Sequence, residues 1–218
     1  MTETYRMDID ANEGNLLIFD RTGYKLIIGI PGQTTREDRY DVWFNLSDGI
    51  PVTPGGMDTY PSRLSRIRIK ATDKCLEVGS GLGEWIPHIL DEIDFDERPT
   101  VIEIADYQKM REMLKYAVGL RIDPQVTPRL ESFVGRCDTY LNSEKVNLIN
   151  QPLVDAIQDN PELVGRFDVI VDVMGANFYR NRSSYGLDIS EIEKRLLASG
   201  GILISQDPDK TFRNTEDK

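Results

Sequence analysis

The chain has 218 residues, with 37 acidic against 26 basic side chains and a formal net charge of −11. This length allows one sizeable core with an appendage and is short for two large domains, and the negative charge argues against broad attraction to nucleic-acid phosphates. The first residues, "MTETYRMDIDANEGN", have neither the basic nor the apolar region of a secretory signal, and no apolar run approaches the length of a membrane span. Two cysteines without metal-ligand spacing and a single histidine, His88, predict neither a disulfide framework nor a zinc site. They favour a reducing cytoplasm.

The N-terminal part of the chain, residues 1–60, is predicted to be a β-rich extension. Residues 15–30 contain two β-like runs around the turn signal "DRTG", which favours a hairpin, and residues 40–45 fit a third strand. The stretch 47–63 is dense in Gly, Pro and Asp and predicts a long loop, either a segment that closes over a ligand or a simple linker. We expect the main domain to follow at residues 61–218.

From residue 74 onward, short apolar runs alternate with helical patterns. Strands are expected at 74–78, 100–105, 146–150, 167–173 and 201–205, and helices at 84–93, 107–118, 127–141 and 189–198. Asp106 and Asp188 are the expected N-caps of two of these helices. Continuous apolar strands are typical of a parallel sheet covered by helices on both faces. With right-handed crossovers this predicts a doubly wound, Rossmann-like α/β fold, whose ligands bind beyond the carboxyl ends of the strands.

A glycine-rich loop, "EVGSGLGE", follows the first of these strands. Gly79, Gly81 and Gly83 allow positive φ angles and let the backbone approach a ligand without a Cβ in the way. A dinucleotide fingerprint, G-x-G-x-x-G, would need its third glycine at the position of Glu84, and a carboxylate there would repel a pyrophosphate. The spacing therefore argues against a dinucleotide.

This loop and the segments after it resemble the class I S-adenosylmethionine-dependent methyltransferases, over about residues 72 to 205. "LEVGSGLG" looks like the first motif of the family, acidic-x-G-x-G-x-G, and "VIEIA" looks like its second strand. "FDVIVDV" resembles the fourth-strand motif, and "LLASGGILIS" is similar to L-x-P-G-G-x-L, with Ser199 in place of the proline. The resemblance implies S-adenosyl-L-methionine as the cofactor.

The same resemblance implies a set of cofactor-binding residues. Glu103 would accept hydrogen bonds from both ribose hydroxyls, and Glu77 would face the ammonium side of the amino acid tail or orient the loop. Gln151 and the two residues after it lie where the family places adenine contacts, an assignment by position alone, for which a plain turn is the alternative. The complete set is Glu77, Gly79, Ser80, Gly81, Gly83, Glu103, Ile104, Gln151, Pro152, Leu153 and Asp172.

The reaction that the resemblance implies is an in-line methyl transfer to a small molecule or a protein. Asp172, at the end of the fourth strand, is the candidate for positioning or deprotonating the acceptor, and Tyr179 is the second; the alternative is that Asp172 only ends its strand. The Asn/Asp-Pro-Pro-aromatic signature of many base-modifying methyltransferases is absent, which argues against a DNA or RNA acceptor. Asp172 and Asp207 resemble in placement the metal ligands of catechol-type O-methyltransferases, but Pro208 replaces the third ligand, so no metal is expected.

Two other functions and several structural questions stay open. An aminopropyl transferase of the polyamine synthase type shares the scaffold, although the acidic pair expected after its fourth strand is missing, and a non-catalytic cofactor-binding protein is the third option. Residues 206–218 are too short for the helix and strand pair that usually complete the family's sheet. Either the sheet is truncated, or the N-terminal hairpin supplies strands, or the sequence is a fragment. No membrane partner is expected, and the oligomeric state is open, with a dimer among the options.

Overall fold

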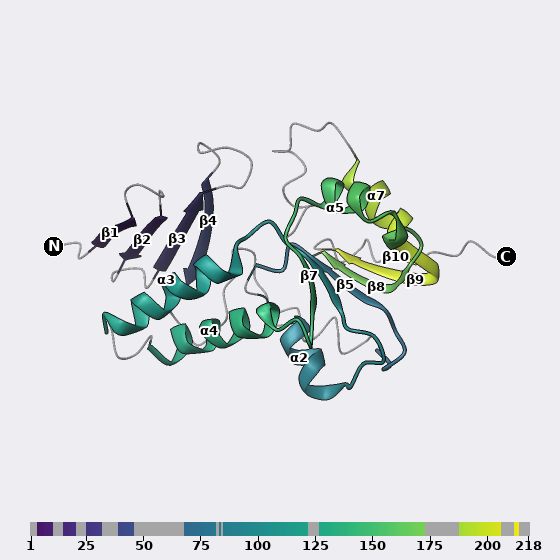
Figure 1. Cartoon of the computed structure of the whole chain (residues 1–218), viewed down its shortest axis with the longest axis horizontal. Coiled ribbons are helices and arrows are strands. Elements are labelled where there is room, and N and C mark those ends of the chain that lie inside the picture. Colours follow the sequence, from purple (N-terminus) through teal and green to yellow (C-terminus); the bar gives the residue numbers. More distant parts are fainter. Residues whose placement is uncertain are drawn as a thin grey trace. The chain divides into compact units, whose positions relative to one another are not determined.

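The structure is a computed structural model that describes part of the chain (Figure 1). Backbone alone is described for residues 4–10, 15–20, 25–31, 39–45, 205 and 212–213, and backbone with side chains for residues 68–81, 83, 85–121, 127–172 and 188–204. The chain divides into two units, described separately below: residues 1–68 with 105–141, and residues 69–104 with 142–218. The predicted domain boundary at residue 60 lies outside the described residues and stays a prediction.

The first unit contains a four-stranded antiparallel meander. Its strands pair in chain order and are β1 (Thr4–Asp10), β2 (Asn15–Asp20), β3 (Lys25–Pro31) and β4 (Arg39–Asn45). The predicted hairpin is β2 with β3, in a register that places Leu17 opposite Ile28. Among the described strands, these four pair only with one another. The N-terminal hairpin therefore does not supply strands to the main sheet, which was one of the three alternatives.

Two helices, α3 (Tyr107–Gly119) and α4 (Thr127–Leu141), belong to the same unit and pack against each other. The rings of Tyr107 and Tyr140 stack with their centroids 4.7 Å apart, which joins the start of one helix to the end of the other. The predicted cap of α3 is confirmed, because the Asp106 carboxylate accepts a hydrogen bond of 3.0 Å from the backbone amide three residues on.

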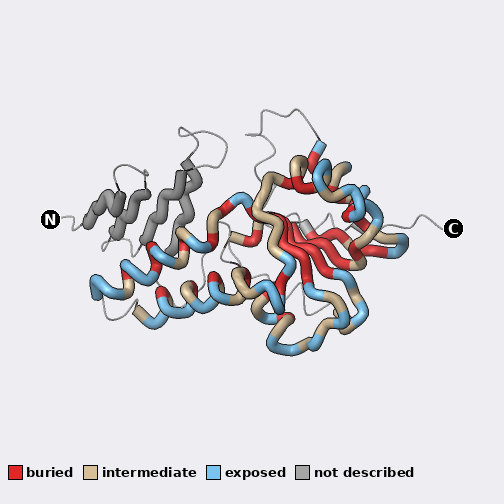
Figure 2. The backbone as a smooth tube through the Cα atoms, in the orientation of Figure 1, coloured by how far each residue is buried: buried red, intermediate tan, exposed pale blue. Residues whose placement is uncertain are grey.

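The second unit is built on a six-stranded sheet of order β10-β9-β8-β5-β6-β7. Its strands are β5 (Cys75–Val78), β6 (Thr100–Ile102), β7 (Asn147–Ile149), β8 (Phe167–Asp172), β9 (Leu197–Ser205) and β10 (Phe212–Arg213). The first five are parallel, and β10 is an antiparallel edge strand beside β9. Figure 2 shows β5, β6 and most of β8 as the buried centre of the unit. The strand order reverses between β5 and β8, which makes that position the topological switch point of a doubly wound sheet.

The helical segments among the described residues of this unit are α2 (Trp85–Glu92), α5 (Leu153–Asp159), the 3₁₀ helix η2 (Pro161–Leu163) and α7 (Ile189–Leu196). In Figure 1, α2 lies on one side of the sheet and α5 and α7 lie on the other. The core beneath α5 and α7 joins these helices to four strands through buried side chains that include Leu76, Ile102, Ala156, Ile170, Leu196 and Leu203. These observations confirm the predicted Rossmann-like α/β fold.

The last parallel strand begins earlier than predicted. Asp188 caps α7 as expected, accepting a hydrogen bond of 3.0 Å from the amide of Ser190. The helix ends at Leu196, two residues before the predicted helix end, and β9 begins at Leu197. Gly201 lies inside β9, where an added Cβ would be 2.8 Å from the carbonyl oxygen of Phe167. The close approach of β8 therefore requires glycine at this position.

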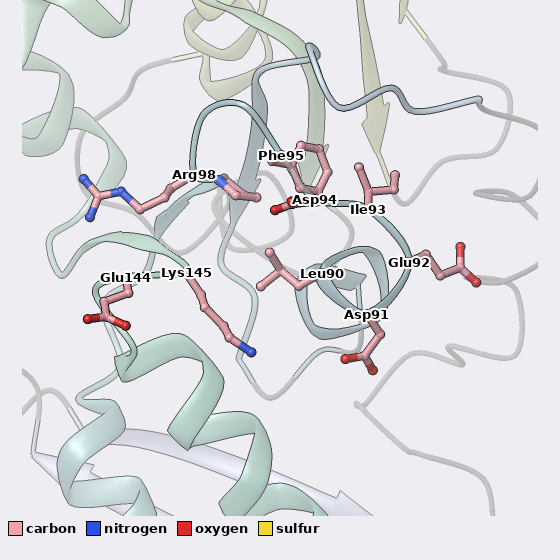
Figure 3. Close-up of a pocket in the computed structure, with 10 residues that line it drawn as sticks. Leu90, Asp91, Glu92, Ile93, Asp94, Phe95, Arg98, Glu144 and Lys145 are labelled. Carbon is pink, nitrogen blue, oxygen red and sulfur yellow. The ribbon is translucent and has the colours of Figure 1, made fainter.

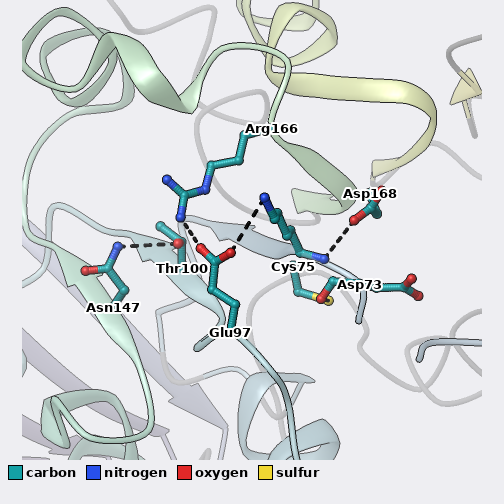
Figure 4. A network of polar contacts seen from close by, with 8 residues as sticks. Asp73, Cys75, Glu97, Thr100, Asn147, Arg166 and Asp168 are labelled. Carbon is teal, nitrogen blue, oxygen red and sulfur yellow. Dashed lines mark hydrogen bonds and ion pairs between the residues drawn. The ribbon is translucent and has the colours of Figure 1, made fainter. Parts of the chain in front are cut away.

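A polar network ties the amino-terminal edge of the sheet together (Figure 4). The Lys74 amide donates to Asp168 over 2.9 Å, while its ammonium lies 3.7 Å from the carboxylate of Glu97. The guanidinium of Arg166 donates to the same carboxylate, and this bond holds the pKa of Glu97 below its usual value. Segments that precede β5, β6 and β8 are thus joined at the edge opposite the expected site. None of the helices in the described part of the chain has the length and apolar character needed to span a bilayer.

Candidate functional site at the carboxyl ends of the strands

The glycine loop follows β5 directly at the switch point. Gly79 and Gly81 have φ angles of +63° and +53°, in the left-handed region that side-chain-bearing residues rarely adopt. The amide of Gly79 donates to the carbonyl of Ile102 over 2.9 Å, and the amide of Gly83 donates to that of Ser80 over 2.7 Å. The loop therefore turns tightly and is anchored to the end of β6. Gly79 and Gly81 thus have the positive φ angles that their glycine residues were predicted to allow.

One hydrogen bond joins the glycine loop to the end of the neighbouring strand. The amide of Gly81 donates to the carboxylate oxygen Oε2 of Glu103 over 2.7 Å, and Glu103 is only 2% exposed. Bonds of this kind, between an amide and a charged acceptor, contribute about 1.5–3 kcal/mol. A Cβ added to Gly81 would meet no heavy atom of the described structure within 4 Å. The loop backbone and a buried carboxylate thus lie side by side, next to open space.

The end of β7 positions Glu103 from its other side. The amide of Glu103 donates to the carbonyl of Ile149 over 3.1 Å, and the side-chain amide of Asn150 donates to the carbonyl of Glu103 over 2.7 Å. These two bonds continue the ladder between β6 and β7 past their last paired residues. The sequence placed Asn150 at a strand end without any role. An amide-bearing residue at the end of an apolar run was the only signal available.

Three carboxylates are buried around this edge of the sheet. Glu77 in β5 is 2% exposed and Asp172, the last residue of β8, is 1% exposed, and Glu103 completes the set. β5 and β8 are neighbours, with Glu77 opposite Val171. A carboxylate oxygen accepts hydrogen bonds, so these residues suit a ligand with donor groups better than a phosphate.

The remaining predicted contacts lie beside β6 and β7. Ser80 is buried in the loop, whereas Ile104, next to Glu103, is 44% exposed and offers an apolar side chain to a ligand. Pro152 stands at the N-cap position of α5, and Leu153 is its first, buried residue. The side-chain nitrogen of Gln151 donates to Asp159 over 3.0 Å. The predicted residues of the glycine loop, β6 and β7 are therefore gathered at one edge of the sheet.

Two residues considered in the sequence analysis lie outside the described residues. Tyr179 lies in residues 173–187, and Asp207 in residues 206–211, both outside the described ranges. The described residues include no group of three His, Cys, Asp or Glu side chains that could hold a metal ion. His88 is exposed on α2, with its imidazole 3.6 Å from the carboxylate of Glu92.

The two thiols are poor nucleophiles. Burial is the largest cause that raises the pKa of Cys75 and of Cys137 from 9.0 to about 12. At neutral pH both side chains therefore stay protonated, and the thiolate, not the thiol, is the reactive form. Both cysteines act as small apolar core residues.

A cavity of about 480 Å³ lies away from this site, before β6 and β7 begin. It is lined by Leu90 to Phe95, Arg98, Pro99, Glu144 and Lys145. In Figure 3, the side chains of Arg98, Glu92 and Glu144 point in different directions and do not converge on a common point. Ligands of open α/β sheets bind at the opposite, carboxyl edge. The cavity is thus not the candidate site.

No protein-family model and no curated protein matches the sequence. Among the solved structures that match is an S-adenosylmethionine-dependent methyltransferase from Thiobacillus denitrificans in complex with S-adenosylhomocysteine, at 20% identity over 70% of this chain and 49% of that one, with a TM-score of 0.41. Aeropyrum pernix fibrillarin with natively bound S-adenosylmethionine matches at 15% identity over 94% and 78%, with a TM-score of 0.38. Spermidine synthase from Thermotoga maritima matches at 14% identity over 93% and 62%, also with a TM-score of 0.38. The chain spans about half the length of the Thiobacillus enzyme. The fold assignment itself is based on the strand order described above.

Proposed function

We propose that the chain is an S-adenosylmethionine-dependent methyltransferase that acts on a small-molecule or protein acceptor. The observation that carries the proposal is the bond between the Gly81 amide and the Glu103 carboxylate, at the ends of two neighbouring parallel strands. It supports a ligand that needs both a close approach to backbone and a carboxylate acceptor. A ribose diol linked to a zwitterionic tail has these requirements.

The residues at the site fit this cofactor by their chemistry. Glu103 would accept from the ribose hydroxyls, since a carboxylate offers about four acceptor positions and can serve the Gly81 amide and a diol together. The amino acid tail would lie against the glycine loop, where the missing side chains leave room for it, and Glu77 would lie on its ammonium side. The exposed side chain of Ile104 would cover one face of the adenine. When bound, the cofactor supplies a methyl group activated by a positively charged sulfur.

Asp172 would act on the methyl acceptor. It ends β8 at the switch point, next to the strand that carries the glycine loop, and it is buried. A carboxylate there can orient an acceptor hydroxyl or amine and take its proton as the methyl group moves from sulfur to the acceptor. Alignment of the two reacting atoms to within about 3–3.5 Å supplies most of such a rate enhancement. Tyr179 remains a second candidate.

The binding test compares S-adenosylmethionine, S-adenosylhomocysteine and NAD by calorimetry. We expect both sulfur compounds to bind in the micromolar range and NAD to bind much more weakly, because Glu84 stands at the third glycine position of the dinucleotide fingerprint. Glu97→Gln is a matched control, since Glu97 precedes β6 at the opposite edge of the sheet and should leave the affinity unchanged. If NAD binds and neither sulfur compound does, the proposal is wrong.

The transfer test uses cofactor labelled in two places. Protein incubated with cell extract and S-adenosylmethionine labelled on the methyl group should pass the label to an acceptor and leave S-adenosylhomocysteine. Decarboxylated S-adenosylmethionine labelled on its aminopropyl chain tests the alternative reaction, for which methylthioadenosine is the other product. Label transfer only from the aminopropyl chain would establish the aminopropyl transferase, and tight binding without any transfer would establish the non-catalytic alternative.

A further inference from the structure

The antiparallel sheet of the first unit has two edge strands, β1 and β4. Among the described strands, none pairs with the outer side of either. The backbone N–H and C=O groups on the outer side of an edge strand can pair with any strand that approaches, so edge strands usually carry features that prevent such pairing. An edge without these features is open to a further strand.

The edge at β1 carries protective features. Three of its seven residues are charged: Arg6, Asp8 and Asp10. Its register with β2 shifts between Asp8 and Asp10, and such a bulge increases the local twist and interrupts regular pairing. The addition of a further strand at β1 is therefore disfavoured.

The edge at β4 lacks these features. Its seven residues, "RYDVWFN", pair with β3 without a shift of register. The strand contains no proline or lysine, and its two charged residues, Arg39 and Asp41, lie in its first half. The four apolar and aromatic residues are of types that are enriched in strands. β4 is thus a regular and mostly apolar edge, of the kind with which a further strand pairs.

An apolar face of the sheet continues up to this edge. Residues that are opposite each other on neighbouring antiparallel strands lie on the same face. One row of such residues crosses all four strands and consists of Met7, Leu17, Ile28 and Val42. A second row on the same face ends at Phe44. A strand paired with β4 would extend this face if it placed apolar residues opposite Val42 and Phe44.

A second copy of β4 meets this requirement. When two copies pair antiparallel about a two-fold axis through Val42, all seven residues of each strand overlap. Tyr40 is then opposite Phe44 of the second copy, and Val42 is opposite its own copy. Asp41 is opposite Trp43, so no two like charges are directly opposite each other. An axis through any other residue shortens the overlap, and an axis through Asp41 would also place two carboxylates opposite each other.

We propose that β4 is the interface of a homodimer, in which two copies of the strand pair antiparallel about Val42. The two four-stranded meanders then form one continuous antiparallel sheet with β1 at both ends. A single pair of strands buries less area than most stable dimers, so we expect a dissociation constant on the order of 10 μM. The inference does not depend on the proposed function, because it concerns only the sheet of the first unit.

Sedimentation of the full chain tests whether it associates. We expect the mass to rise from the 24.8 kDa of one chain toward twice that value as the concentration increases from about 1 to 300 μM. Sedimentation shows a dimer without showing which surface forms it.

Cysteine cross-linking tests the surface and the register. Directly opposite residues of antiparallel strands have Cα atoms about 4.5–5.5 Å apart, a distance that a disulfide can bridge. Under mild oxidation, Val42→Cys should therefore form a covalent dimer with itself. Tyr40→Cys and Phe44→Cys should each stay unlinked alone and link when the two variants are mixed. The native Cys75 and Cys137 are buried, so the parent protein should stay unlinked.

Met7→Cys is the matched control for Val42→Cys. Met7 belongs to the same row of residues but lies on β1, the opposite edge of the sheet. We expect no covalent dimer of this variant under the conditions that link Val42→Cys.

Charge variants test the same register without oxidation. In the proposed dimer, Arg39 is opposite Asn45 of the second copy, at both ends of the paired strands. Asn45→Asp creates two attractive pairs, and the double variant Arg39→Asp/Asn45→Asp creates two repulsive ones. The dissociation constant of the double variant should be higher than that of Asn45→Asp by roughly tenfold or more. Both variants carry the same new carboxylate opposite Lys25 of β3, so its effect within one chain is shared.

The outcomes decide the proposal. A dimer that links at Val42→Cys, and in the mixture of Tyr40→Cys with Phe44→Cys, supports it. A chain that stays monomeric at the highest concentration refutes it and leaves the edge to a strand of a different protein. A dimer in which Val42→Cys folds and stays unlinked also refutes it, because another surface then joins the copies. If circular dichroism shows that the cysteine variants do not fold, equal dissociation constants of the two charge variants would refute it.

Discussion

The contact between Glu103 and the ribose can be tested by changing both partners. Glu103→Gln keeps the shape of the side chain but removes its charge and one acceptor oxygen, so at least one charge-assisted hydrogen bond to the diol is lost. Such a bond is worth about 1.5–3 kcal/mol, which corresponds to a ten- to hundredfold or larger rise in the dissociation constant of S-adenosylhomocysteine. Because the carboxylate also accepts from the Gly81 amide, the single substitution alone cannot separate contact with the ligand from damage to the loop.

The 2′-deoxy analogue of S-adenosylhomocysteine makes this separation. Calorimetry with both ligands on the parent protein and on Glu103→Gln gives a double-mutant cycle. If Glu103 binds the diol, the variant should bind the 2′-deoxy analogue about as well as it binds S-adenosylhomocysteine. The loss of binding free energy from the substitution and the missing hydroxyl together would then be much smaller than the sum of the two separate losses. Fully additive losses would show that Glu103 acts only on the loop and would refute the ribose assignment.

Three further predictions concern stability and reactivity. Gly201→Ala should lower the free energy of unfolding by about 1–3 kcal/mol in urea denaturation, because its Cβ would meet the Phe167 carbonyl oxygen. Gly135→Ala, inside α4 where a Cβ meets no neighbour, should instead raise the free energy of unfolding by about 0.5–1 kcal/mol. Equal effects of the two substitutions would contradict the packing described. Asp106→Ala should cost about 1 kcal/mol by the same measurement through loss of the α3 cap, and an unchanged denaturation midpoint would argue against that cap. Cys75 should resist iodoacetamide at pH 8 in the folded protein and react after unfolding, since burial raises its pKa from 9.0 to about 12 and favours the neutral thiol. Because the buried thiol is favoured in its neutral form, its contribution to the free energy of unfolding is complete below pH 9 and is lost as the pH rises toward 12. Alkylation of Cys75 in the folded protein at the rate of a free thiol would refute this description.

The sequence predicted the elements whose patterns are long and locally capped. The helix at 127–141 was predicted with the bounds that the structure has, and the cap at Asp106 forms as expected. Apolar runs predicted all five parallel strands, and three of them, β5, β6 and β8, are buried at every residue but Asp168. The order of the strands was not predicted, because right-handed crossovers give a doubly wound sheet without fixing which strands pair.

The elements that were not predicted are short or have a weak sequence pattern. Helix α5 has seven residues and no side-chain cap, so its sequence is hard to distinguish from a turn. No strand was predicted at the position of β1, although Tyr5, Met7 and Ile9 alternate with polar residues as a half-buried strand requires. The early start of β9 depends on its pairing with β8, which no local pattern at Ser199 or Gly200 reveals.

The site was predicted as a set of types and not as a set of contacts. Glycines with positive φ and an acidic residue at the end of the next strand could be recognised from spacing, and the structure places Gly81 and Glu103 in hydrogen-bond contact. The hydrogen bonds of Asn150 to Glu103 and of Gln151 to Asp159 could not be recognised, because each joins residues that only the folded chain brings near. A backbone conformation that requires glycine can be recognised in the sequence, whereas a hydrogen bond between residues of separate elements cannot.

A crystal structure of the chain with S-adenosylhomocysteine would test the central claim most directly. We expect the ribose hydroxyls within hydrogen-bond distance of the Glu103 carboxylate, the amino acid tail on the loop from Gly79 to Gly83, and the purine beside Gln151. A ligand bound at the amino-terminal edge of the sheet, near Arg98 and Lys145, would contradict it. So would a ribose at the carboxyl edge that makes no contact with Glu103.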